Sequence, residues 1–173
     1  MASKNIHKVK VRVHPAVHRQ LENNFAKKQG AYDLRKHFYY KLISAGLTRQ
    51  KVAVPSMLSK RYDKLKEVEI QITSWDYHHY GDEITPVYQV SLSKYLYEEL
   101  LYNACYQVLL AHVYGLIPRD TAIKEYLLNS LFEDDELNYP ALRKHYQRHW
   151  METEKAFKND LAEMVIKSSN KGH

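Results

Sequence analysis

Alternation of apolar and polar residues near the start of the chain predicts a β-strand. In residues 8–13, Lys-Val-Lys-Val-Arg-Val, every second side chain is a valine and the others are basic. Successive side chains of a strand point to opposite faces, so we expect the valines to face a core and the basic residues to face outward. The same period of two predicts strands at residues 67–73 and 87–93.

Apolar residues three or four positions apart predict helices around these strands. Behind Pro15, the spacing of Val17, Leu21 and Phe25 is typical of a helix that buries one face. We expect Gln29-Gly30 to end that helix, because glycine adopts the left-handed conformation easily. The helices predicted in this way cover residues 15–28, 33–46, 57–66, 96–114 and 120–131, and a further one runs from Pro140 to Val165.

We make three further predictions for the helix at 33–46 and for the segments that follow it. Asp33 is expected to be the N-cap of the helix. Residues 48–55 are typical of a linker and residues 75–84, polar and aromatic, of a loop. The buried stripe expected for the helix consists of Leu34, Phe38, Leu42 and Ala45.

The pattern of the first 46 residues recurs later in the chain. An offset of 79 places Val11 on Val90 and Leu21 on Leu100. Two interpretations stay open: a diverged second copy of one motif, or the ordinary likeness of two strand-helix-helix segments. The sequence predicts a mainly α fold with a short β-ribbon (α+β). The domains expected are residues 1–50, a linker helix, strand and loop over 51–86, and a mainly helical module over 87–173.

Charge is distributed very unevenly along the 173 residues. Residues 1–66 hold 16 Lys and Arg against three acidic residues, a net charge of +13, whereas residues 67–173 have a net charge of −7. Such segregation costs self-repulsion unless a polyanion offsets it, which favours nucleic acid as a partner. An anionic membrane surface is a weaker candidate, because no basic stretch carries a broad apolar face.

Composition excludes several further classes. One cysteine, Cys105, rules out an intramolecular disulfide framework and a Cys-based zinc finger, and it is expected in the core. No apolar run approaches the roughly 20 residues that span a bilayer, and no signal-peptide core follows the basic start, so we expect a cytoplasmic protein. There is no P-loop, dinucleotide fingerprint or nucleophile elbow, and neither enzymatic activity nor a cofactor is expected.

A six-residue strand needs a partner for its backbone N–H and C=O groups. We expect that partner to be a second copy of the strand in a homodimer, or residues 87–93 of the same chain. A two-stranded ribbon fits the major groove of DNA, where Lys and Arg donate to guanine. Residues 7–46 resemble the ribbon-helix-helix (MetJ/Arc/CopG) class of DNA-binding domains in their basic strand, their Val-His-Pro passage into a helix and their glycine turn.

The resemblance implies which residues contact double-stranded DNA. By position, the outward residues Lys8, Lys10 and Arg12 would read bases. In this class the start of the second helix binds a phosphate, because its free N–H groups carry partial positive charge. The residues expected at or near phosphates are Tyr32, Arg35, Lys36, Lys27 and Lys28.

These features predict a dimeric, sequence-specific transcriptional regulator, with an activator of plasmid-transfer or mobile-element genes as one form of it. Assembly of dimers on adjacent sites and recruitment of RNA polymerase are the expected further interactions. An accessory protein that marks an origin of transfer in a relaxosome is the alternative within the same class. An RNA-binding protein and a metal-dependent nuclease also stay open, and the ligands of the nuclease would be Asp76, His78, His79, Asp82 and Glu83.

Overall fold

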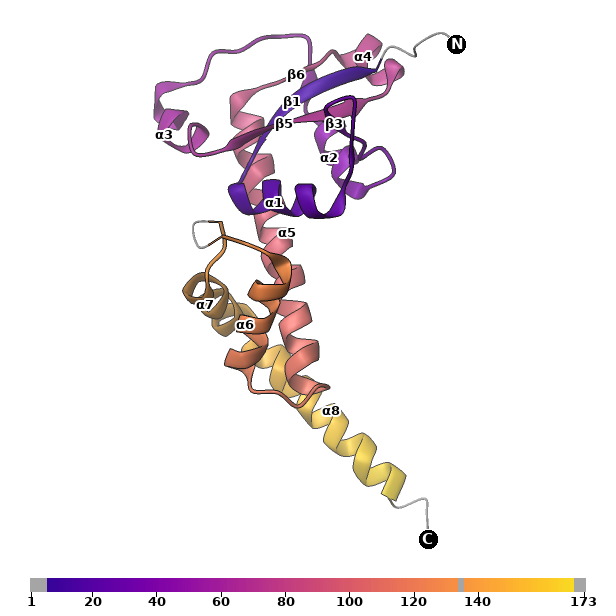
Figure 1. The fold of residues 1–173 in the computed structure, drawn as a ribbon, viewed down its shortest axis with the longest axis vertical. Helices are drawn as coiled ribbons and strands as arrows, with labels where there is room; N and C mark the ends of the chain where they lie inside the picture. Colours follow the sequence, from indigo (N-terminus) through magenta and orange to yellow (C-terminus); the bar gives the residue numbers. More distant parts are fainter. Residues whose placement is uncertain (1–5, 134–135, 170–173) are drawn as a thin grey trace. The chain divides into compact units, whose positions relative to one another are not determined.

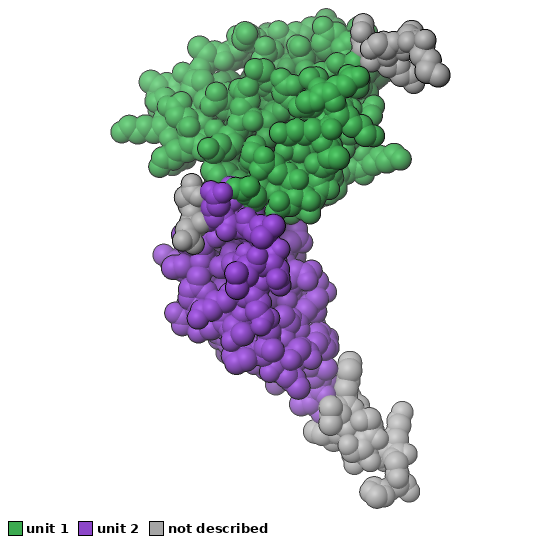
Figure 2. Space-filling view, viewed as in Figure 1, with its two compact units in different colours: residues 1–99 green, residues 100–173 purple. Residues whose placement is uncertain are grey.

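The computed structural model describes residues 6–133 and 136–169, with the side chains of 164–169 left aside. The chain forms two compact units, residues 1–99 and 100–173 (Figure 2). Their boundary falls inside one long helix, α5 (Pro86–Val113), which starts in unit 1 and ends in unit 2. The expected 1–50 domain and the 51–86 segment therefore belong to one unit.

Unit 1 is built on the two strands whose alternation is clearest in the sequence. β1 (His7–Val13) and β5 (Lys66–Ile72) pair antiparallel, with Val11 opposite Val68 (Figure 1). The alternate residues of both strands are buried, so the predicted strands at 8–13 and 67–73 and their inward faces are confirmed. The strand beside β1 is thus β5 of the same chain, and the expected pairing with residues 87–93 is wrong because those residues are helical. Along this edge of β1, the backbone N–H and C=O groups pair with β5 and do not need a second copy of the chain.

A short hairpin completes the sheet. β3 (Ala31–Tyr32) runs parallel to β5, with Tyr32 opposite Ile70, and β2 (Lys27–Lys28) pairs with β3, which gives the order β1-β5-β3-β2. Gln29 and Gly30 both have positive φ, as a tight hairpin turn requires. The first predicted helix is therefore shorter than expected. Helix α1 (Pro15–Asn24) ends before this hairpin, and Gln29-Gly30 turns the chain between strands.

The second helix of unit 1 starts later than its predicted cap. Helix α2 (Phe38–Ala45) is capped by His37, whose ring accepts from the N–H of Tyr39. Asp33 is not the cap, because the helix begins at Phe38; its carboxylate binds Arg35 instead. The predicted stripe through Phe38 is wrong: Phe38 is 44% exposed, and the helix buries its neighbour Tyr39 and Ile43 instead.

The segment between these helices and α5 holds more structure than predicted. The expected basic helix over 57–66 is only a 3-10 turn, η1 (Ser56–Leu58), followed by α3 (Ser59–Tyr62). The predicted loop over 75–84 is wrong, since Thr73 caps a helix there, α4 (Ser74–Tyr80). After it, β6 (Glu83–Ile84) pairs with β4 (Leu47–Thr48), which lies directly after α2.

Residues 87–93 form the first turns of α5, so the strand predicted there is wrong. Gln89, Leu92, Ser93 and Leu96 are buried, a spacing of three and four that belongs to a helix. Pro86 occupies the first helical position, where its missing N–H costs nothing. The interpretation of this region as a diverged second copy of the motif is therefore wrong. The offset of 79 aligns Val11, which lies in a strand, with Val90, which lies in a helix.

Unit 2 is helical. It contains the end of α5, then α6 (Arg119–Ser130), α7 (Tyr139–His149) and α8 (Met151–Ser169). Cys105 is fully buried, as predicted. The single helix expected from Pro140 is two helices that meet at Trp150. The fold is mainly helical with a small mixed sheet, which confirms the α+β class. Within the described residues, no helix is long and apolar enough to cross a membrane.

Candidate nucleic-acid interface

The outward face of the β1–β5 pair carries acidic as well as basic side chains. Lys10 and Arg12 lie opposite Glu69 and Glu67. The ammonium of Lys10 lies 2.9 Å from a Glu67 oxygen, and the guanidinium of Arg12 lies 3.7 Å from the other. Lys8 pairs with Glu69 at 3.0 Å. Opposite charges across a strand pair stabilise the pairing, which favours β5 as the partner of β1.

Arg12 connects this face to α3 and to the open edge of the sheet. Its guanidinium lies over the ring of Tyr62, 4.6 Å from the centroid. Its backbone N–H points away from β5 and donates to the side chain of Gln89 at 2.8 Å, while the amide of Gln89 donates to the carbonyl of Ile84 at 2.9 Å. Gln89 therefore covers part of the edge through which a second copy of β1 would have to pair.

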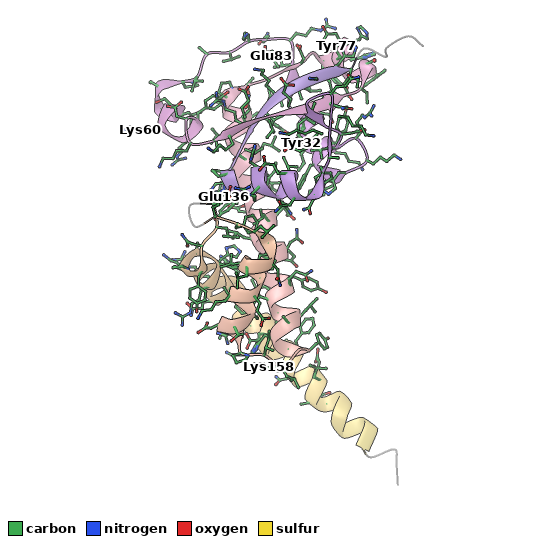
Figure 3. All side chains as sticks on the ribbon, viewed as in Figure 1. Tyr32, Lys60, Tyr77, Glu83, Glu136 and Lys158 are labelled. Carbon is green, nitrogen blue, oxygen red and sulfur yellow. The ribbon has the colours of Figure 1, made fainter. Side chains whose placement is uncertain are left out.

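Exposed cations gather where α3 leads into β5. We refer to Lys60, Arg61, Lys64 and Lys66 as the α3 cluster; all four are exposed, and Figure 3 shows Lys60 projecting from α3. Within the described residues, none of the four takes part in an ion pair, in contrast to Lys8, Lys10 and Arg12. The cluster adjoins the outward face, because Tyr62 of α3 lies under Arg12. It is one of the parts of unit 1 whose exposed cations have no ion pair among the described residues; Lys27, Lys28 and Lys36 are others.

Folding reduces the charge contrast seen along the sequence. Unit 1 as a whole has 17 Lys and Arg against 10 acidic residues, a net charge of +7. Unit 2 has 9 against 10, a net charge of −1. The acidic excess expected for the later part of the chain therefore lies mostly in residues 67–99, which fold against the basic segment.

Of the five residues expected at phosphates, one is buried and four are exposed. Tyr32 is only 1% exposed, so its predicted phosphate contact is wrong: pairing beside Ile70 turns its side chain into the core. Arg35 donates to both oxygens of Asp33, at 2.8 and 2.6 Å. These hydrogen bonds hold the pKa of Asp33 at about 2. The exposed side chains among the five are those of Arg35, Lys36, Lys27 and Lys28.

The expected N-terminal phosphate site of the second helix is also absent from the predicted position. Ala31 and Tyr32 form strand β3, and α2 begins only at Phe38, so residues 31–33 do not present the free N–H groups of a helix start. The contacts that remain available to a phosphate in this region come from the exposed lysines of β2 and from Lys36.

Of the residues suggested as nuclease ligands, Asp76, His78 and His79 lie on α4, whereas Asp82 and Glu83 follow that helix. Asp76, in the first turn of α4, is buried, and its carboxylate accepts from Tyr40 and from Thr73, while Glu83 belongs to β6. His79 binds the carbonyl of Trp75 at 2.8 Å. Among the residues that the structure describes, no three His, Cys, Asp or Glu side chains are placed to hold a metal ion. The nuclease alternative therefore lacks a ligand set in that part of the chain.

The structure also shows a charged network that sequence reasoning missed. Glu154 in unit 2 is 4% exposed. Its carboxylate accepts from Arg119 at 3.0 and 3.2 Å, from the hydroxyl of Tyr146 at 3.0 Å and from Lys158 at 2.8 Å. His112 lies 3.3 Å from the same carboxylate. A signal was present, since Glu154 is four residues after Trp150 and three before Phe157, on the apolar side of the predicted helix.

Comparison of the chain with protein-family models, with curated proteins and with solved structures gives no match.

Proposed function

We propose that the protein binds double-stranded DNA through unit 1 and acts as a sequence-specific transcriptional regulator. The observation that carries the proposal is the α3 cluster, four exposed cations without ion pairs among the described residues, beside the outward face of β1 and β5. Lysine and arginine that neutralise phosphates release counterions from DNA, and this term supplies most of non-specific affinity. The α3 cluster therefore provides the phosphate contacts of the proposed complex.

Base reading is assigned to the outward face of the β1–β5 pair. A two-stranded ribbon fits the major groove, where Lys and Arg donate to guanine and Glu accepts from the amino group of cytosine. Lys10 and Arg12 supply the donors, and Glu67 and Glu69 supply the acceptors. This ribbon belongs to one chain, in contrast to the ribbon-helix-helix class, whose ribbon joins two chains.

Unit 2 is proposed to contact a protein partner, such as RNA polymerase, because its net charge of −1 makes it a poor ligand for DNA. The alternative role at an origin of transfer uses the same DNA contacts. Footprinting on the DNA around the protein's own gene separates the two roles, since one predicts protection at a promoter and the other at a transfer origin.

Removal of the α3 cluster is expected to weaken binding to all duplexes alike. A variant with Lys60, Arg61 and Lys64 replaced by alanine loses three positive charges, and its log–log salt slope should fall by about 2–3. Fluorescence anisotropy over a salt series measures this. The matched control replaces Lys124, Lys144 and Arg148 of unit 2, which are also exposed. Equal salt slopes for the two variants would contradict the proposed interface.

Replacement of Lys10 by alanine tests base reading in the same assay. If Lys10 donates to a base, Lys10→Ala should lose about 1–3 kcal/mol at the specific site and much less on random duplex. The ammonium of Lys10 is exposed, so its exchange from Glu67 to a base does not require the fold to open. An equal loss of affinity for the specific and the random duplex would show that Lys10 contributes positive charge and does not read a base. Competition with duplex RNA tests the RNA-binding alternative.

A further inference from the structure

A hollow in unit 1 lies between helices α2 and α4. Its volume is about 380 Å³, within the range of small-molecule sites. The residues that line it are Lys41, Ser44, Ala45, Leu47, Trp75, Asp76 and Tyr80. It therefore combines a carboxylate, two aromatic rings and one lysine, and none of the proposed DNA contacts involves it.

The carboxylate of Asp76 is held in place with one oxygen engaged. Asp76 is 8% exposed. Its Oδ2 accepts from the hydroxyl of Tyr40 and, at 2.5 Å, from the hydroxyl of Thr73. Burial, and then the hydrogen bond to Asp76, raise the pKa of Tyr40, so its hydroxyl stays a donor. No hydrogen bond within the described residues reaches Oδ1, so this oxygen remains an acceptor for a ligand.

The aromatic walls are largely open to solvent. Trp75 is 56% exposed and Tyr80 is 45% exposed. The indole of Trp75 stacks on His79, with ring centroids 4.1 Å apart, and meets Tyr80 edge to face. Flat rings such as nucleobases stack well on an exposed indole. Lys41, exposed on α2, adds a cation to the lining.

We propose that this hollow takes one unpaired nucleobase of a nucleic-acid strand. The base stacks on Trp75, a ring or amino N–H of the base donates to Oδ1 of Asp76, and Lys41 contacts the adjoining phosphate. A cationic ligand would also suit an aromatic wall and a carboxylate, but Lys41 and the net charge of +7 on unit 1 oppose it. The inference rests on the proposed function, since it supplies the nucleic acid.

Duplexes with a single bulged nucleotide test the inference. The probes are a DNA duplex with one bulged adenine, the same duplex with a bulged abasic site, the fully paired duplex and a single-stranded oligonucleotide. We expect the protein to bind the bulged adenine about tenfold more tightly than the abasic bulge, the effect of stacking one base. Trp75 fluorescence should be quenched at the same time, and the Trp75→Ala variant, in which buried Trp150 is the remaining tryptophan, gives the background emission.

Two variants with one matched control decide the outcome. Trp75→Ala at the exposed wall and Asp76→Asn at the floor should each abolish the preference for the bulged base. Asp82→Asn removes the same charge from an exposed position nearby and should keep it. Equal binding of the base and abasic bulges by the wild-type protein, or quenching of Trp75 by tetramethylammonium instead of by the oligonucleotides, would overturn the inference.

The two proposals fail in different ways. If the protein binds the paired duplex but does not distinguish the two bulges, the hollow is not a base site and the DNA interface stands. If no duplex binds but the single strand quenches Trp75, the base site stands and the duplex interface falls. The Trp75→Ala variant should bind the fully paired duplex like the wild-type protein, because the hollow lies apart from the α3 cluster in the sequence and in its contacts.

Discussion

Replacement of Glu154 by glutamine is expected to destabilise unit 2 by about 2–3 kcal/mol, less than the cost of breaking a fully buried ion pair from one side, because the side chains of Arg119 and Lys158 are 27% and 49% exposed. The carboxylate is the common acceptor for Arg119, Tyr146 and Lys158. A neutral amide keeps the shape of the side chain but removes the negative charge that Arg119 and Lys158 share. The free energy of unfolding, from urea titration followed by circular dichroism, measures the loss.

A neighbouring glutamate provides the control. Glu152 on the same helix is 87% exposed and pairs with Lys155 at 3.1 Å. Exposed pairs of this kind contribute about 0–1 kcal/mol, so Glu152→Gln should leave the unfolding midpoint nearly unchanged. Equal effects of the two substitutions would show that the network around Glu154 does not stabilise unit 2.

The same carboxylate makes stability depend on pH. Burial by itself would raise the pKa of Glu154, but hydrogen bonds from Lys158, Arg119 and Tyr146 outweigh burial and lower the pKa to about 2. A glutamate in the unfolded chain has a pKa of about 4.3, so the unfolded state binds more protons below that value. The contribution of Glu154 is therefore fully present at neutral pH and is lost as the pH falls from about 4.5 toward 2. Glu154→Gln should flatten this part of the stability profile.

Replacement of Gly81 by alanine is expected to cost about 2–4 kcal/mol in unit 1. Gly81 ends α4 with φ +102°, a conformation that costs residues with a side chain about 1–3 kcal/mol. A Cβ at this position would lie 2.6 Å from the carbonyl oxygen of Thr48, a backbone atom of β4 that pairs with β6 and cannot move away cheaply. The change should lower the urea midpoint of unit 1.

The same substitution at Gly30 separates the cost of the backbone conformation from the cost of the close contact with Thr48. Gly30 also has positive φ, +82°, but a Cβ there would meet only the end of the Lys8 side chain, at 3.6 Å. Gly30→Ala should therefore cost about 1 kcal/mol, from backbone conformation alone. If Gly81→Ala costs no more than Gly30→Ala, the close approach of Thr48 is not what requires glycine at position 81.

Local pattern predicted some elements because their signal lies within a few residues. The valines of β1 alternate over the whole strand, and the helix behind Pro15 repeats its apolar residues every four positions. Residues 87–93 show how such a signal misleads. Tyr88, Val90 and Leu92 alternate as they would in a strand. The buried residues Gln89, Leu92 and Leu96, however, have the spacing of a helix, and Pro86 is a typical first residue of one. This spacing is not visible in the pattern of apolar positions, because one of the buried residues is a glutamine.

The candidate site residues also include some features that local pattern predicts and others that it does not. The sequence by itself determined that Lys8, Lys10 and Arg12 share one face of a strand, because alternation is a property of the strand alone. It also determined that positive charge is concentrated in residues 1–66. Only the tertiary structure decided that β5 lies beside that strand with two glutamates, that Tyr32 is in the core, and that Trp75 and Asp76 line one hollow. Pairing partners and burial depend on contacts between residues far apart in the chain, and no local periodicity encodes them.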